Sequence, residues 1–153
     1  MRSRFIVISV MLIAALSSRG AQAHCEVPCG IYGDETRVAL LREHITTVEK
    51  SMTMIRILGA DAEINYNQLI RWTNNKEKHA DEIQHIVSQY FMTQRIKPAA
   101  GPGAEYDAYV AKITLLHELL IKAMKSKQTL EQAQIDDMRK IVDKFEALYF
   151  EKK

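Results

Sequence analysis

Residues 38–55 read VALLREHITTVEKSMTMI, and their apolar members recur at alternating steps of three and four residues. The recurring positions are Val38, Leu41, Ile45, Val48, Met52 and Ile55. Such steps place side chains on one face of an α-helix, and an apolar face of this kind packs against other helices. Asp34 is a suitable N-cap residue, and the pattern stops near Gly59. The sequence therefore predicts an amphipathic helix between these two residues.

Three further helices are predicted by the same periodicity. They cover about Asn67 to Gln94, about Glu105 to Lys125 and about Leu130 to Glu151. The segment Lys97–Gly103 holds two prolines and two glycines, a composition that interrupts helices. No stretch alternates with period two, as a half-buried strand would. Four amphipathic helices joined by short links predict an all-α protein, an antiparallel up-down four-helix bundle.

The predicted bundle carries no familiar metal motif inside it. A di-iron carboxylate bundle needs two Glu-x-x-His motifs and two further acids, whereas only Glu82-x-x-His85 fits here. No Cys-x-x-Cys-His motif for covalent haem is present. His44, His85 and His117 have no partner at ligand spacing, so we interpret each as a surface or packing histidine.

Two polar residues fall on the apolar stripe of the second predicted helix. Lys76 and His79 lie between Trp72 and Ile83 on that stripe. They are either a polar patch that receives another part of the chain or partly solvated positions at a helix seam. The sequence leaves both interpretations open.

The first 23 residues have the features of an export signal. Arg2 and Arg4 precede a twelve-residue apolar run from Phe5 to Leu16, which is too short to span a bilayer. Ala21-Gln22-Ala23 matches a signal-peptidase cleavage site. We therefore expect residues 1–23 to be a cleaved signal peptide, with a mature chain of 130 residues that begins at His24. The expected localisation is periplasmic or secreted, where thiols tend to oxidise.

Removing the leader changes the charge of the protein. The 153-residue chain has 21 Lys and Arg and 19 Asp and Glu, a formal charge of +2. The leader holds three arginines and no acid, so the mature chain has 18 basic and 19 acidic residues, a charge of −1. This balance gives no general attraction for phosphate backbones, so we expect no nucleic-acid partner. We also expect no membrane association of the mature form.

The new N-terminus brings several metal donors together in one short segment. The predicted cut frees an α-amine on His24, beside the only two cysteines, Cys25 and Cys29. The amine, the Cys25 amide nitrogen and the Cys25 sulfur form fused chelate rings, and Cys29 closes a fourth position if the chain turns at Pro28. A planar set of two nitrogens and two sulfurs suits Ni(II) or Cu(II) better than zinc, which prefers a tetrahedron.

Spacing alone leaves other interpretations of this segment open. Cys25 and Cys29 also suit a local disulfide that staples the N-terminus of a helical interaction protein. The same donors equally suit an exported nickel or copper carrier without catalysis. Tyr32 alone is as consistent with packing as with a place over an open metal face.

The segment His24-Cys25-x-x-Pro28-Cys29-Gly30-x-Tyr32 at a processed N-terminus resembles the nickel-binding hook of nickel-containing superoxide dismutases. The resemblance implies that His24 supplies its amine and an axial imidazole, Cys25 an amidate and a thiolate, and Cys29 the second thiolate. It also implies that Tyr32 lines the approach of superoxide and acts in catalysis. Glu26 stands where the family commonly has aspartate.

The resemblance also implies an activity and an assembly. The expected reaction is the disproportionation of superoxide to O₂ and H₂O₂ by Ni(II)/Ni(III) cycling, with one nickel per subunit of a homohexamer. The expected organisation is a nickel superoxide dismutase domain over residues 24–153. Within it, residues 24–32 form an irregular N-terminal metal-binding hook and residues 34–152 form the four-helix bundle.

Overall fold

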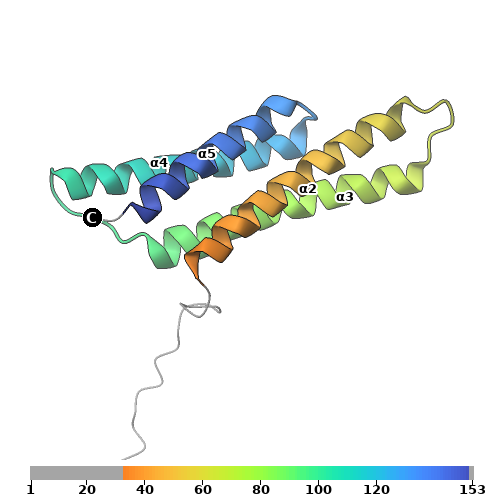
Figure 1. Cartoon of the computed structure of the whole chain (residues 1–153). Coiled ribbons are helices and arrows are strands. Elements are labelled where there is room, and N and C mark those ends of the chain that lie inside the picture. Colours follow the sequence, from red (N-terminus) through yellow and green to blue (C-terminus); the bar gives the residue numbers. More distant parts are fainter. Residues whose placement is uncertain (1–32, 152–153) are drawn as a thin grey trace, which may run out of the picture.

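The computed structural model describes residues 33–151, which form four long helical rods and no strand (Figure 1). Successive rods run in opposite directions, so the predicted antiparallel up-down bundle is confirmed. The helices are α2 (Asp34–Ala60), α3 (Tyr66–His85) with its π-helical continuation η1 (Ile86–Arg95), α4 (Ala104–Gln128) and α5 (Gln132–Phe150). None of these helices is long and apolar enough to cross a bilayer.

The start of α2 differs from the prediction in one respect. The N-cap is Gly33, and no side chain caps the helix there. Asp34 is instead the first helical residue. The prediction of Asp34 as N-cap was wrong because the Asp34 carboxylate accepts hydrogen bonds from distant residues rather than from its own helix.

The second rod changes its winding near its middle. α3 ends at His85, and η1 continues directly from Ile86 to Arg95. In a π-helix the hydrogen bonds join residues five apart, so each turn contains more residues than in an α-helix. The wider turn keeps buried residues facing the core, namely Ile86, Val87, Tyr90 and Phe91. The prediction of one continuous helix to Gln94 had the right extent but not this change of winding.

A single apolar core runs through the bundle. Five of the six apolar positions predicted for the first helix are buried, and Ile55 is half-buried. The centre is aromatic, because Phe91 meets Phe145 edge-on at a ring distance of 4.9 Å and Tyr149 at 5.5 Å. Both phenylalanines are fully buried. Burial of apolar side chains, to which these large rings contribute, is the main stabilising contribution in a globular domain.

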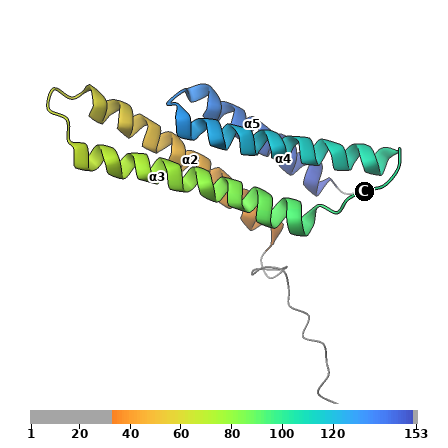
Figure 2. The same ribbon diagram turned by 180° about the vertical axis from the view of Figure 1, so that it is seen from behind.

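The bundle consists of two helical hairpins. α2 packs along α3, α4 packs along α5, and contacts of α3 with α4 and of α2 with α5 join the pairs. Seen from the front and from behind, the α2–α3 tip projects beyond the α4–α5 connection (Figures 1 and 2). The opposite end, which we call the Gly33 end, gathers the starts of α2 and α4 and the ends of η1 and α5. The described chain therefore begins where three other chain segments meet.

Candidate metal centre and its support

The predicted metal ligands His24, Cys25 and Cys29, and the predicted catalytic Tyr32, lie outside the described residues. The described chain begins at Gly33, the residue after Tyr32. The structure therefore describes the part of the bundle that directly follows this segment in the chain, namely the Gly33 end.

The described bundle contains no competing metal site. Between residues 33 and 151, no group of three or more His, Cys, Asp or Glu side chains is arranged to hold a metal ion. Both cysteines of the chain belong to the N-terminal segment. An amine, an amidate and two thiolates fit nickel by their donor chemistry, because nitrogen and sulfur donors in a plane suit Ni(II).

Asp34 anchors the first turn of α2 to two other elements. Its carboxylate accepts hydrogen bonds from the Tyr90 hydroxyl at 2.5 Å, the Tyr149 hydroxyl at 2.8 Å and the Arg95 guanidinium at 2.8 Å. Tyr90 and Arg95 belong to η1, and Tyr149 belongs to α5. The side chain of Asp34 is only 15% exposed, so these bonds form in a largely dry setting. We call these four residues the Asp34 cluster.

The electrostatics of the Asp34 cluster favour an ionised carboxylate between neutral phenols. Burial raises the pKa of Asp34, but the hydrogen bonds from Arg95, Tyr90 and Tyr149 outweigh it and hold that pKa below its ordinary 3.8. Burial, and then the bond to Asp34, raises the pKa of Tyr149 to about 12. The same two causes raise the pKa of Tyr90. The cluster therefore keeps its charges throughout the physiological pH range.

A cleft of about 450 Å³ opens beside the Asp34 cluster. Arg95 and Tyr149 form one wall, the segment Lys97–Ala99 another, and the first turns of α4 the rest. Lys112 of α4 lies over the Tyr149 ring, 5.7 Å from its centre. We call this the lysine cleft, after Lys97 and Lys112. Sequence analysis missed it because its walls come from three separate segments, residues 95–99, residues 105–112 and Tyr149, which only the fold brings together.

Two histidines that the sequence left unpaired lie in contact between α2 and α3. The Nδ1 atoms of His44 and His79 are 2.8 Å apart, so one nitrogen donates a hydrogen bond and the other accepts it. Burial and the neighbouring His79 lower the pKa of His44. This contact agrees with the interpretation of His44 as a packing histidine, and its partner lies on the facing helix rather than at ligand spacing along its own.

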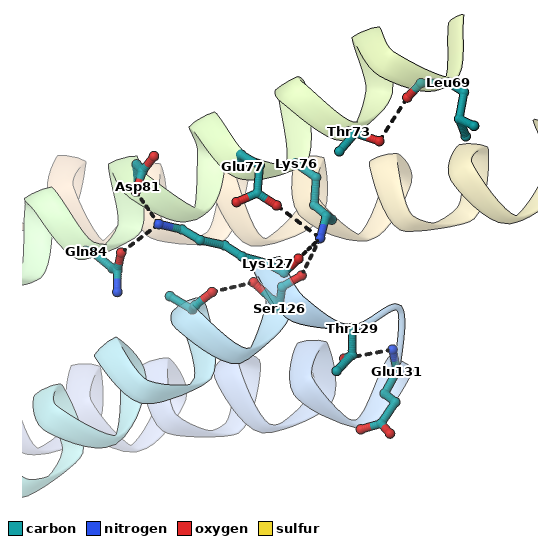
Figure 3. Close-up of polar contacts among 11 residues, drawn as sticks. Leu69, Thr73, Lys76, Glu77, Asp81, Gln84, Ser126, Lys127, Thr129 and Glu131 are labelled. Atoms are coloured by element: carbon teal, nitrogen blue, oxygen red, sulfur yellow. Dashed lines mark hydrogen bonds and ion pairs between the residues drawn. The ribbon is translucent and has the colours of Figure 1, made fainter. Parts of the chain in front are cut away.

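Lys76 has a structural role inside the bundle. Its side chain is 5% exposed, and its amine donates to the carbonyl oxygens of Ser126, at 3.0 Å, and of Lys127 (Figure 3). These carbonyls belong to the last turn of α4, where a cation is favoured. Lys127 in turn contacts Asp81 and Gln84 of α3 (Figure 3). Lys76 therefore joins the two hairpins.

The fold is an all-helical bundle, and its residues 33–151 contain no group of three or more His, Cys, Asp or Glu side chains arranged to hold a metal ion. Comparison with family models identifies the family to which this helical protein belongs. The model described as nickel-containing superoxide dismutase matches residues 19–153, a range that includes His24 to Tyr32.

The chain belongs to the nickel-containing superoxide dismutase family. It is therefore a nickel-containing oxidoreductase that acts on superoxide. Neither a search of curated proteins nor a search of solved structures found a match.

Proposed function

We propose that the dismutase activity of this chain resides in residues 24–32, which we call the hook, with nickel held by His24, Cys25 and Cys29. The observation that carries the proposal is the segment His24-Cys25-x-x-Pro28-Cys29, directly after the predicted signal-peptidase site and within the matched range. Cleavage between Ala23 and His24 creates the amine that completes the donor set. The proposal thus depends on the export signal being removed at this bond.

Each hook residue has a distinct task in the proposed site. His24 supplies its amine and its imidazole, Cys25 an amidate and a thiolate, and Cys29 the second thiolate. Bound nickel would supply a one-electron Ni(II)/Ni(III) couple, which anionic donors would bring into range for oxidising one superoxide to O₂ and reducing the next, with two protons from solvent, to H₂O₂. Tyr32 lines the approach of superoxide and restricts it to small anions.

The bundle supports the hook rather than taking part in the chemistry. The Asp34 cluster fixes the first turn of α2 immediately after Tyr32. A rigid helix start next to the hook helps to keep the metal ligands near their productive geometry. Further support comes from neighbouring subunits in the proposed exported homohexamer.

Replacing Cys29 by serine tests the proposal. Changes behind a metal ligand already cost about 10–100-fold, so loss of a thiolate should lower nickel-dependent dismutase activity by more than about 100-fold. The matched control is Lys78→Gln, at an exposed position in the middle of α3. Activity would be followed by superoxide decay and nickel by native mass spectrometry of the mature chain.

The same mass spectrum separates the competing interpretations. A chain that starts at His24 and carries one nickel, with activity lost in Cys29→Ser, supports the proposal. Full activity in Cys29→Ser contradicts it. A nickel-loaded chain without dismutase activity would be a carrier, and a metal-free chain lighter by two hydrogen atoms would hold a Cys25–Cys29 disulfide.

A further inference from the structure

The contact between His44 of α2 and His79 of α3 links two helices through groups that titrate near neutral pH. Their Nδ1 atoms are 2.8 Å apart, and both side chains are half-buried where α2 packs along α3. An unperturbed imidazole gains a proton near pH 6.5, so its surroundings decide whether it is charged at physiological pH. The strength of this link therefore depends on the protonation of the two rings.

The hydrogen bond between the two rings tolerates one extra proton but not two. With both rings neutral, one Nδ1 carries a hydrogen atom and the other presents a lone pair. With one proton added, a positively charged ring donates to a neutral ring, and the bond is kept. A second proton leaves two N–H groups and two positive charges facing each other across 2.8 Å. The contact then changes from attractive to repulsive.

The groups around His44 oppose the second proton. Burial and the neighbouring His79 lower the pKa of His44 below its ordinary 6.5. Glu82 of α3 and Glu43 of α2 favour the charged ring, but they do not outweigh these two causes. Among the described residues, α4 and α5 contribute no charged group that acts on His44. This ring therefore stays neutral until the pH falls below 6.5.

We propose that His44 and His79 form an acid-sensitive latch, which holds α2 against α3 at neutral pH and breaks when both rings are protonated. Protonation of neighbouring histidines switches packing interfaces in the same way in pH-sensing proteins. The latch involves only residues of the two helices, so it does not depend on how nickel is bound. Because the pKa of His44 is lowered in the folded protein, the latch stabilises the fold fully above pH 6.5. This stabilisation is lost as the pH falls below 6.5 through the folded pKa.

A second polar contact between the same two helices provides a matched comparison. Asn75 of α3 donates a hydrogen bond to the Ser51 hydroxyl of α2 at 3.0 Å, about two turns of α2 beyond His44. Neither an amide nor a hydroxyl side chain titrates between about pH 5 and pH 8. Removing the Ser51 hydroxyl should therefore lower stability by the same amount at every pH in this range.

Urea unfolding of the mature protein with its metal, between about pH 8 and pH 5, tests the latch. His44→Gln keeps a polar side chain next to His79 but cannot gain a proton. One proton changes an equilibrium constant by at most about tenfold per pH unit, so below pH 6.5 the unfolding constant of the original protein should rise by up to that factor relative to His44→Gln. Ser51→Ala should be less stable than the original protein but follow the same pH dependence. The metal site is common to all three proteins, so its own pH dependence cancels. Parallel curves for His44→Gln and the original protein would overturn the proposal.

Titration of the histidine ring nitrogens by NMR gives a second readout, which begins with the original protein in its folded state. We expect the His44 ring to gain its proton below pH 6.5. In His79→Gln the titration midpoint of His44 should move upward, because the charge of the neighbouring ring is gone. A His44 midpoint at or above pH 6.5, or one that does not move in His79→Gln, would show that the two rings are not coupled and would overturn the proposal.

Discussion

A single carboxylate, that of Asp34, fixes the first turn of α2, directly after the proposed metal-binding segment. Two phenols and one guanidinium donate to it, and they come from residues 56, 61 and 115 positions further along the chain. Hydrogen bonds to a buried charged group contribute about 1.5–3 kcal/mol each, and removing the charge leaves the donors poorly paired. Asp34 is therefore the residue at the Gly33 end whose change should matter most.

We expect Asp34→Asn to lower the free energy of unfolding by about 1.5–3 kcal/mol at pH 7. The folded pKa of Asp34 lies below its ordinary 3.8, so the ionised carboxylate stabilises the fold above that pH. This contribution is lost as the pH falls below 3.8 through the folded pKa. The difference between the two proteins should therefore shrink below pH 3.8, as measured by urea unfolding.

The control for this prediction is Glu118→Gln, at an exposed position of α4, which should change stability by less than about 0.5 kcal/mol. A pH-independent difference between Asp34→Asn and the original protein would show that the charge of Asp34 is not what stabilises the cluster.

Residue-scale contacts were the part of the fold that the sequence predicted least well. Asp34 has the local features of an N-cap residue, yet its partners are far away along the chain and outcompete the helix terminus. His44 and His79 are 35 positions apart and meet only because α2 and α3 pack together. Local patterns carry no information about such pairs.

At the scale of elements, periodicity predicted the helices well. Five of the six apolar positions predicted for α2 are buried, and the Pro- and Gly-rich segment separates η1 from α4. The π-helical winding of η1 was not predicted. The choice between bonds four and five residues apart depends on packing against the rest of the core, and the apolar pattern of residues 86–91 suits both.

Replacing either of two glycines by alanine should change the free energy of unfolding, in opposite directions. Gly103, at the start of α4, has φ 142° and ψ 175°, a conformation restricted to glycine. An added Cβ there meets no atom within 4 Å, so the cost of Gly103→Ala is conformational, about 1–3 kcal/mol. Gly59 lies in the last turn of α2 and is equally open, so Gly59→Ala should stabilise by at most about 0.5–1 kcal/mol, the value for a helix interior.

Thermal and urea unfolding of both glycine variants would check these signs. Because each replacement adds the same methyl group to open space, the pair isolates backbone conformation from packing. A neutral Gly103→Ala protein would show that the start of α4 relaxes to an ordinary backbone conformation.

At the scale of the whole molecule, stability depends on how the two hairpins are joined. Arg42 of α2 bonds Asp143 and Glu146 of α5, both at 2.5 Å, but these side chains are largely exposed and contribute little. The buried link is Lys76, whose amine binds the end of α4. The α2–α3 hairpin thus supplies a hydrogen-bond donor to the carbonyl groups in the last turn of α4, in the other hairpin.

We expect Lys76→Met to lower the free energy of unfolding by about 1–3 kcal/mol, because it keeps the apolar stem and leaves the Ser126 and Lys127 carbonyls without their donor. Lys78→Met, on the exposed side of α3, is the matched control. Hydrogen exchange at the end of α4 should also accelerate in Lys76→Met alone. Unchanged exchange there would show that the α4 terminus does not depend on α3.

The sequence predicted the architecture and the family of the molecule, since helix periodicity and a short donor segment are both local patterns. It predicted the ligands His24, Cys25 and Cys29 by resemblance, and these remain predictions because they lie outside residues 33–151. The lysine cleft and the hairpin link at Lys76 were not predictable, because both are made by segments that only the tertiary fold assembles.

The bond between Tyr149 and Asp34 also sets an order of events during biosynthesis. These residues are 115 positions apart, so the mount beneath the hook is incomplete until nearly the last residue of the chain has been synthesised. A growing chain exposes Cys25 and Cys29 long before that moment. We therefore expect nickel loading at the proposed hook to be a late step of maturation, before which the two thiols are open to oxidation.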